Sequence, residues 1–231
     1  SGIGADEIFG GYQSFRWASL IVSSGWIPRK VFNAAGVFPD DRRKKFKFLG
    51  LKSVVGEYLF NRGFFAPSTA ARLLGCTERE INTILEIFNE HIPEFTKKLY
   101  AEERASYMER NFYMQNQLLK DTDYMSMWHG LEVRVPFLDK ELMEMAFQIH
   151  PSVRYDSPQP KHLLIEAFRS ELPREIWDRP KQGFSFPLDQ WMQKVTAKGS
   201  ATNAKSMHDG LLKGNIHWSR YWSYVIAQEN L

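Results

Sequence analysis

A glycine-rich segment at the start of the chain, Ser1–Gly11, carries residue types suited to phosphate chemistry. Gly2 and Gly4 permit a turn whose backbone N–H groups can approach a phosphate closely. Asp6 follows at the mouth of a predicted helix, and its carboxylate is a hard oxygen ligand of the kind that Mg²⁺ prefers. Taken alone, the pattern leaves a second interpretation open, in which Asp6 only caps the helix.

The third motif along the chain, 179–186 with the sequence RPKQGFSF, presents a cation in a predicted rigid loop. Lys181 stands beside Pro180 and close to Phe184, so its ammonium group has a stiff backbone and an aromatic neighbour. Such a group could neutralise negative charge that builds up on a transferring phosphate or adenylate. Without further context, Lys181 would be an ordinary solvated surface charge.

The second motif along the chain, 123–139, contains the extended stretch LEVRVPF. Glu132 and Arg134 alternate there with apolar residues, which places a carboxylate and a guanidinium on one side of the backbone. The structural alternative is a partly buried ion pair that fixes the loop. Asp123 is an acidic position of the same segment, and Asp139 is placed to cap a following helix.

Together and in their order along the chain, the segments 1–12, 123–139 and 179–186 resemble the C-terminal part of the ATP-dependent synthetase domain of glutamine-hydrolysing asparagine synthetases, which are related to the β-lactam synthetases. The resemblance runs from the first residue to about Trp191. It implies a mainly α chain, namely the helical C-terminal portion of an adenine nucleotide alpha hydrolase-like (PP-loop ATPase) α/β domain. The sheet half of that domain would be largely missing.

The resemblance also implies roles for individual residues, with ATP and Mg²⁺ as cofactors. Lys181 would be catalytic and would stabilise the adenylation transition state. Asp6 would bind the Mg²⁺ that accompanies pyrophosphate. The positions that would line the nucleotide are Ser1, Gly2, Gly4 and Asp6, and those that would form the acceptor site are Asp123, Glu132 and Arg134. Aspartate would be the acceptor, and an N-terminal glutaminase domain of a longer parent would supply ammonia from glutamine.

Two departures from the family pattern leave the acceptor open. Ile3 stands where well-studied relatives carry Glu or Tyr, and Tyr124 stands where Arg is frequent. The family's SGGxDS pyrophosphate loop and N-terminal Cys do not occur in this chain, so we expect it to be inactive alone. Alternatives are an amidotransferase acting on another carboxylate and a non-catalytic helical interaction module.

The composition narrows the classes of protein to which the chain could belong. The chain has 231 residues, of which 43% are hydrophobic and 25% charged, as in ordinary globular domains. The net charge of +3 is too small to predict a nucleic-acid partner, and no apolar run reaches the roughly 18 residues of a membrane span. A single cysteine, Cys76, and no signal peptide favour the cytoplasm.

Strand signals are scarce outside Leu131–Val135, so the chain should be built from helices. We expect one helix over Glu7–Ser24 and the longest over Thr96–Leu119. A capping box of Thr77 and Glu80 predicts another helix, whose buried face would carry Ile81, Ile84, Leu85 and Phe88.

Two polar segments are interpreted without a catalytic role. The basic run from Arg42 to Lys47 could bind an anion, but we favour a solvated helix face. The segment Lys198–Lys213 is rich in polar and small residues and is predicted to be a mobile loop.

Overall fold

The computed structural model describes residues 1–38, 40–156, 159–178, 186–195 and 201–229. Every regular element in these ranges is helical, which confirms the mainly α prediction. The stretch Leu131–Val135 is irregular rather than paired into a sheet. No helix in the described ranges is long and apolar enough to cross a membrane.

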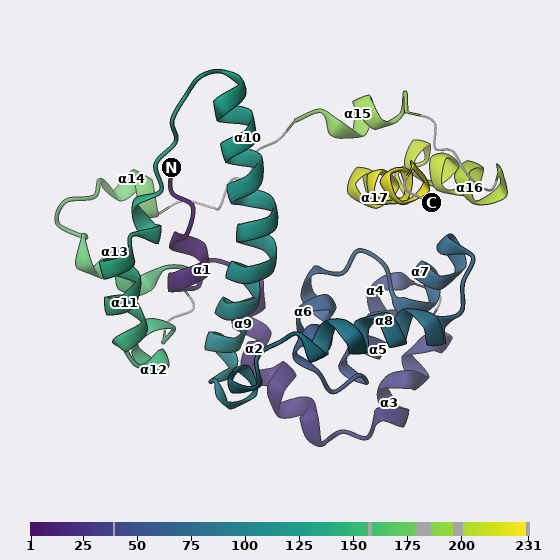
Figure 1. Cartoon of the computed structure of the whole chain (residues 1–231), viewed down its shortest axis with the longest axis horizontal. Helices are drawn as coiled ribbons and strands as arrows, with labels where there is room; N and C mark the ends of the chain where they lie inside the picture. Colours follow the sequence, from purple (N-terminus) through teal and green to yellow (C-terminus); the bar gives the residue numbers. More distant parts are fainter. Residues whose placement is uncertain (39, 157–158, 179–185, 196–200, 230–231) are drawn as a thin grey trace. The chain divides into compact units, whose positions relative to one another are not determined.

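The chain, coloured along its sequence in Figure 1, divides into two compact units. Unit 1 contains Ser1–Ile27, Ser53–Asn61 and Asn89–Arg179, and unit 2 contains Pro28–Lys52, Arg62–Phe88 and Pro180–Leu231. Each unit is therefore assembled from segments that are far apart in the sequence.

Unit 1 holds the first two motifs. Its elements in chain order are α1 (Ala5–Phe9), α2 (Gln13–Ser23), η1 (Ser24–Trp26), most of α6 (Val54–Arg62), η3 (Glu94–Lys98), α9 (Ala101–Met108), the π-helix η4 (Glu109–Leu119), α10 (Lys120–Trp128), η5 (Pro136–Leu138), α11 (Lys140–Gln148), α12 (Pro151–Arg154), α13 (His162–Ala167) and α14 (Arg174–Trp177).

One continuous helical rod dominates unit 1, because α9, η4 and α10 follow one another without a break (Figure 1). The predicted longest helix therefore begins later, at Ala101, and extends further, to Trp128. No Gly or Pro interrupts the chain between Pro93 and Gly130, so nothing in the sequence forces a stop at Leu119. The α1 helix packs against this rod.

The apolar core of unit 1 surrounds α1. Ile8 and Phe9 are buried together with Ala146 of α11. Partly buried residues from the second motif, from α11 and from α13 complete the cluster, namely Phe137, Leu138, Met143, Phe147, Leu163 and Leu164. The core thus fixes the glycine-rich turn against segments that come much later in the chain.

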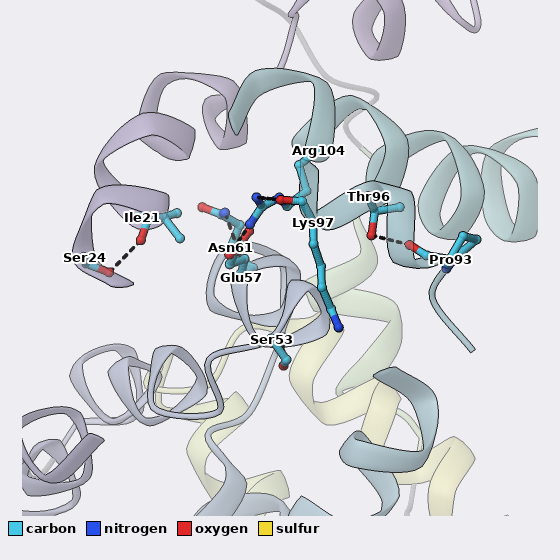
Figure 2. A network of polar contacts seen from close by, with 10 residues as sticks. Ile21, Ser24, Ser53, Glu57, Asn61, Pro93, Thr96, Lys97 and Arg104 are labelled. Atoms are coloured by element: carbon cyan, nitrogen blue, oxygen red, sulfur yellow. Dashed lines mark hydrogen bonds and ion pairs between the residues drawn. The ribbon is translucent and has the colours of Figure 1, made fainter. Parts of the chain in front are cut away.

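Polar contacts attach α6 to the rod (Figure 2). Arg104 of α9 donates from Nη1 to Glu57 Oε1 at 2.8 Å and from Nη2 to the Lys97 carbonyl oxygen at 3.1 Å. Burial raises the pKa of Glu57, and the positive charge of Arg104 opposes that rise. Thr96 Oγ1 donates to the Pro93 carbonyl oxygen at 2.8 Å, which closes the short η3 turn before the rod.

Unit 2 consists of shorter helices and the C-terminal pair. Its elements are α3 (Arg29–Asn33), η2 (Ala34–Val37), α4 (Asp41–Lys44), α5 (Phe46–Leu49), α7 (Pro67–Leu74), α8 (Glu78–Glu90, up to Phe88), α15 (Leu188–Met192), α16 (Ala201–Leu212) and α17 (Trp218–Glu229). Its core joins α7, α16 and α17 through Leu73, Met207, Leu211, Tyr221, Tyr224 and Val225.

The α8 helix confirms its predicted start but not its predicted burial. The Glu80 backbone N–H donates to Thr77 Oγ1 at 3.2 Å, and the Thr77 N–H donates to Glu80 Oε2 at 2.7 Å, as a capping box requires. Ile84 and Phe88, however, are 50% and 54% exposed. Periodicity identifies an apolar face, but it does not determine whether another element covers that face.

The predicted loop at Lys198–Lys213 is instead helical over nearly all of its described part, since α16 spans Ala201–Leu212. Met207 and Leu211 are one helical turn apart and are both buried against α17. Gly210 lies so close to Ile216 that an added Cβ would be 2.5 Å from Ile216 Cδ1. The small residues that suggested a loop therefore serve close packing.

Candidate functional site

The glycine-rich segment divides the predicted helix over Glu7–Ser24 into two. The α1 helix ends at Gly10, which has a left-handed φ of 79°, and α2 begins three residues later at Gln13. The Gly11 N–H donates to the Asp6 carbonyl oxygen at 2.8 Å. A Cβ at Gly11 would lie 1.6 Å from Asp6 Oδ1, so only glycine fits beside this carboxylate.

Asp6 pairs with a cation from a distant part of the sequence. Lys161 Nζ lies 3.1 Å from Asp6 Oδ1, and both side chains remain partly exposed. Lys161 is the N-cap of α13 and has a left-handed φ of 58°, which is uncommon for a residue with a side chain. The position of Lys161 directly before α13 thereby brings an ammonium group to the carboxylate predicted to bind Mg²⁺.

The buried side chain of Glu7 stabilises the glycine-rich turn through hydrogen bonds. Glu7 accepts from the Gly4 N–H at 3.1 Å and from the Tyr12 hydroxyl at 2.6 Å, so it joins the two ends of the segment. Burial raises the pKa of Glu7, and the hydrogen bond from Tyr12 opposes the rise. Burial and the nearby Glu7 carboxylate also raise the pKa of Tyr12. Ser106 of the rod donates to the Glu7 carbonyl oxygen at 2.7 Å.

The structure brings the first and second motifs together. The Ser1 nitrogen donates to the Arg134 carbonyl oxygen at 2.8 Å. Gly4 has a φ of 102°, and a Cβ there would lie 2.6 Å from Leu138 Cδ2. Gly2 is exposed, with open space where its side chain would be. The backbone of the turn is therefore fixed by the segment 123–139 and still open at Gly2.

The charged residues of the second motif lie at the surface. Arg134 Nε donates to Glu132 Oε1 at 2.9 Å, but these side chains are 84% and 73% exposed, respectively. The ion pair of the alternative interpretation is therefore present, but it is exposed rather than partly buried, because the extended segment runs over the outside of the unit. Asp123 is also exposed, on α10. Asp139 caps α11 as predicted, accepting from the N–H groups of Glu141 and Leu142.

The third motif lies almost entirely outside the described residues. Lys181 belongs to the segment 179–185, of which the structure gives no description, and only Phe186 of the motif is placed. The catalytic role of Lys181 stays a prediction.

A pocket of about 770 Å³ is lined by residues that flank Lys161 in the sequence and by the end of the glycine-rich segment, but not by Asp6 or Lys161. Gly11, Pro160 and His162 contribute to its lining, and Arg16 of α2 and Tyr155 lie in its wall. This volume is in the range of about 300–1,000 Å³ that is typical of small-molecule sites.

The side chains around Asp6 are compatible with Mg²⁺ as an ion shared with phosphates. Within the described ranges, no three His, Cys, Asp or Glu side chains gather closely enough to hold a metal by themselves. Mg²⁺ is commonly held by only one or two carboxylates, with water and phosphate oxygens as the other ligands. The single carboxylate of Asp6, beside a partly exposed turn, fits that arrangement.

Comparison with known proteins identifies the family of the chain. A family model described as asparagine synthase matches residues 1–213, which includes all three motifs. The chain belongs to the asparagine synthase family. No solved structure gave a significant match.

Individual relatives of the asparagine synthase family are distant. The chain is 29% identical over 200 residues to a glutamine-hydrolyzing asparagine synthetase of Bacillus subtilis, covering 84% of this chain and 31% of the relative. It is 38% identical over 88 residues to the human glutamine-hydrolyzing asparagine synthetase, covering 37% and 15%. It is 25% identical over 222 residues to the amidase chry2 of Gibberella zeae, covering 83% and 32%. The chain thus spans less than a third of the length of these relatives.

Sequence reasoning missed two residues of this site. Lys161 precedes a helix and belongs to none of the three motifs. Its position in the sequence therefore gives no indication that it contacts Asp6. Glu7 did carry a signal, because an acid three residues after the helix N-cap is the capping-box position.

Proposed function

We propose that the chain is part of an ATP-dependent amidotransferase that converts aspartate to asparagine. The observation that carries the proposal is the Asp6 carboxylate, held between Gly11 and Lys161 at a partly exposed glycine-rich turn. Membership of the asparagine synthase family supports the same reaction.

The proposed reaction has two steps. An oxygen of the aspartate side-chain carboxylate attacks the α-phosphorus of ATP, and the bond to the bridging oxygen breaks as pyrophosphate leaves. Ammonia derived from glutamine then attacks the acyl carbon, loses a proton and releases AMP. The products are asparagine, AMP and pyrophosphate.

The residues of this chain would act mainly on the leaving pyrophosphate. Asp6 would hold the accompanying Mg²⁺, which when bound neutralises charge on the phosphates. The Lys161 ammonium would face the same charge from the other side of Asp6. Lys181 is proposed to stabilise the adenylation transition state, where negative charge grows. The exposed Asp123, Glu132 and Arg134 are proposed to contact the acceptor.

Ile3 in the turn supports an acceptor other than aspartate. This apolar residue is half-buried at a position where a polar side chain would approach the reacting carboxylate in the family pattern. One relative is named an amidase rather than an asparagine synthetase. The alternative is therefore the same chemistry on a different carboxylic acid.

The test is pyrophosphate release from ATP by the intact protein, with this chain alone as the control. Release that needs both aspartate and ammonia, with none from the chain alone, is the expected result. Release that needs a different carboxylic acid would show that this acid, rather than aspartate, is the acceptor, and the proposed type of reaction would stand. Failure with every carboxylate would contradict the proposal and favour a non-catalytic helical interaction module.

A further inference from the structure

The ring of Tyr155, the residue that ends α12, lies against the backbone of the glycine-rich turn. A Cβ added at Gly10 would be 3.0 Å from Tyr155 Cδ1 and 3.5 Å from Tyr155 Cε1, so the ring and this glycine are in close contact. Phe15 of α2 approaches the same glycine, and its ring centroid lies 5.2 Å from that of Tyr155. Gly10 therefore packs against two aromatic rings, and one of them comes from a distant part of the sequence.

Gly10 and Gly11 in turn fix the position of Asp6. The N–H groups of both glycines donate to the Asp6 carbonyl oxygen, and the bond from Gly11 is 2.8 Å long. The Asp6 carboxylate lies directly beside Gly11, where an added Cβ would be 1.6 Å from Oδ1. A displacement of this backbone therefore displaces the carboxylate as well.

The Tyr155 ring has a rigid support of its own. The guanidinium carbon of Arg154 lies 4.9 Å from the centroid of the Tyr155 ring. Arg154 is fully buried, and its Nη2 donates to Glu103 Oε1 of the rod at 3.0 Å. The ring is thus held at the turn by a residue that is itself fixed to α9.

The contact between Tyr155 and the turn differs from ordinary core packing. Tyr155 is half-buried, and it lines the pocket of about 770 Å³ together with Gly10 and Gly11. Among the described residues, the apolar cluster around Ile8 does not include Tyr155. Removal of the ring should therefore act on the turn rather than on the core of unit 1.

We propose that Tyr155 is a positioning residue for Asp6, because its ring holds the backbone of Gly10 and Gly11 on which the carboxylate rests. The inference rests on the proposed function in one respect, namely that Asp6 binds Mg²⁺. Lys161, six residues further along the chain, lies 3.1 Å from the same carboxylate. Asp6 is thus fixed through its backbone by Tyr155 and through its side chain by Lys161.

The first test is the Mg²⁺ dependence of pyrophosphate release by the intact protein. Tyr155→Leu keeps an apolar side chain but removes the ring atoms that contact Gly10. We expect the Mg²⁺ concentration for half-maximal release to rise about 10–100-fold, as when a residue that orients a metal ligand is replaced. Release at saturating Mg²⁺ should approach the wild-type rate, whereas a general loss of structure would lower release at every Mg²⁺ concentration. Tyr155→Phe retains the contacting ring atoms and should behave like the wild type.

Tyr107→Leu is the matched control variant. Tyr107 is also a half-buried tyrosine of unit 1, but its ring contacts Phe95, with the two centroids 5.6 Å apart. Urea unfolding of both leucine variants establishes that each is folded, and only Tyr155→Leu should shift the Mg²⁺ dependence. If Tyr155→Leu does not unfold cooperatively, Tyr155→Met takes its place, because methionine adapts to irregular spaces.

A second measurement does not depend on catalysis. Hydrogen–deuterium exchange in the intact protein, read by mass spectrometry on a peptide that contains Gly10 and Gly11, reports on the two N–H groups bound to the Asp6 carbonyl oxygen. We expect exchange to be faster in Tyr155→Leu than in the wild type. Tyr155→Phe and Tyr107→Leu should exchange as the wild type does.

Three results would overturn the proposal. They are wild-type exchange at Gly10 and Gly11 in Tyr155→Leu, equal acceleration in Tyr107→Leu or Tyr155→Phe, and faster exchange in Tyr155→Leu with an unchanged Mg²⁺ dependence. Failure of the proposed function is a distinct outcome, in which the wild type releases no pyrophosphate with any carboxylate. The exchange measurement then decides by itself whether Tyr155 positions Asp6.

Discussion

Lys161 Nζ lies 3.1 Å from Asp6 Oδ1, and this contact joins the glycine-rich turn to the segment before α13. The pair places one cation beside the carboxylate to which Mg²⁺ binding is ascribed. A divalent ion at Asp6 would therefore share the carboxylate with Lys161, and both positive charges would face the same phosphates.

Replacement of Lys161 by Met tests this arrangement. We expect pyrophosphate release by the intact protein to fall about 100-fold, as when one group that stabilises a growing charge is removed. The free energy of unfolding should change by less than about 1 kcal/mol, because the pair is partly exposed. Lys140→Met, which removes an exposed partner of Glu144, is the matched control and should leave release unchanged. Equal release by both variants would remove Lys161 from the site.

Gly11→Ala should displace Asp6 without changing any charge. The new Cβ would lie 1.6 Å from Asp6 Oδ1, so the carboxylate must move away from Lys161. We expect release of pyrophosphate to fall, together with a loss of about 1–3 kcal/mol in unfolding free energy from overpacking. Gly25→Ala has open space around its Cβ and should behave like the wild type. Wild-type activity in Gly11→Ala would show that the position of Asp6 is unimportant.

Glu7 makes a pH-dependent contribution to stability. Its pKa is raised by burial, so the folded chain binds this proton more tightly than the unfolded chain, where the group titrates near pH 4.5. The resulting stabilisation is present below that pH and is lost as the pH rises through the raised pKa. Urea unfolding should show Glu7→Gln gaining stability relative to wild type as the pH increases. The exposed control Glu141→Gln should not follow this trend, and parallel curves for Glu7→Gln and wild type would contradict the prediction.

Arg154 is expected to be a stability residue of unit 1. Its side chain is fully buried, donates to the Ala146 carbonyl oxygen at 2.8 Å and pairs with Glu103 at 3.0 Å. Arg154→Met leaves both acceptors without this donor and should cost about 3 kcal/mol in urea unfolding. The exposed pair of Arg174 and Asp178 provides the control, since Arg174→Met should cost less than about 1 kcal/mol. Similar losses for the two variants would show that burial of Arg154 is not decisive.

Local signals predicted the helices, but not the contacts that complete the site. The Asp139 cap and the capping box at Thr77 depend on neighbouring residues, so the sequence is sufficient to predict them. The pairing of Asp6 with Lys161 depends on how α12 and α13 pack, which no local pattern records. The same reason explains α16, because the apolar partners of Met207 lie in other helices.

The π-helix Glu109–Leu119 has a consequence for the helix α10 that follows it and carries Asp123. Its first residue, Glu109, is buried and accepts from Ser14 Oγ at 2.8 Å, so the start of the widened turns is fixed to α2. Loss or gain of one residue within this stretch would rotate α10 by about 100° about its axis. Asp123 would then point in another direction although its own sequence were intact. The direction of the Asp123 side chain thus depends on the number of residues that precede it in the rod. We therefore expect a single-residue insertion or deletion in the rod to be more disruptive than a substitution there.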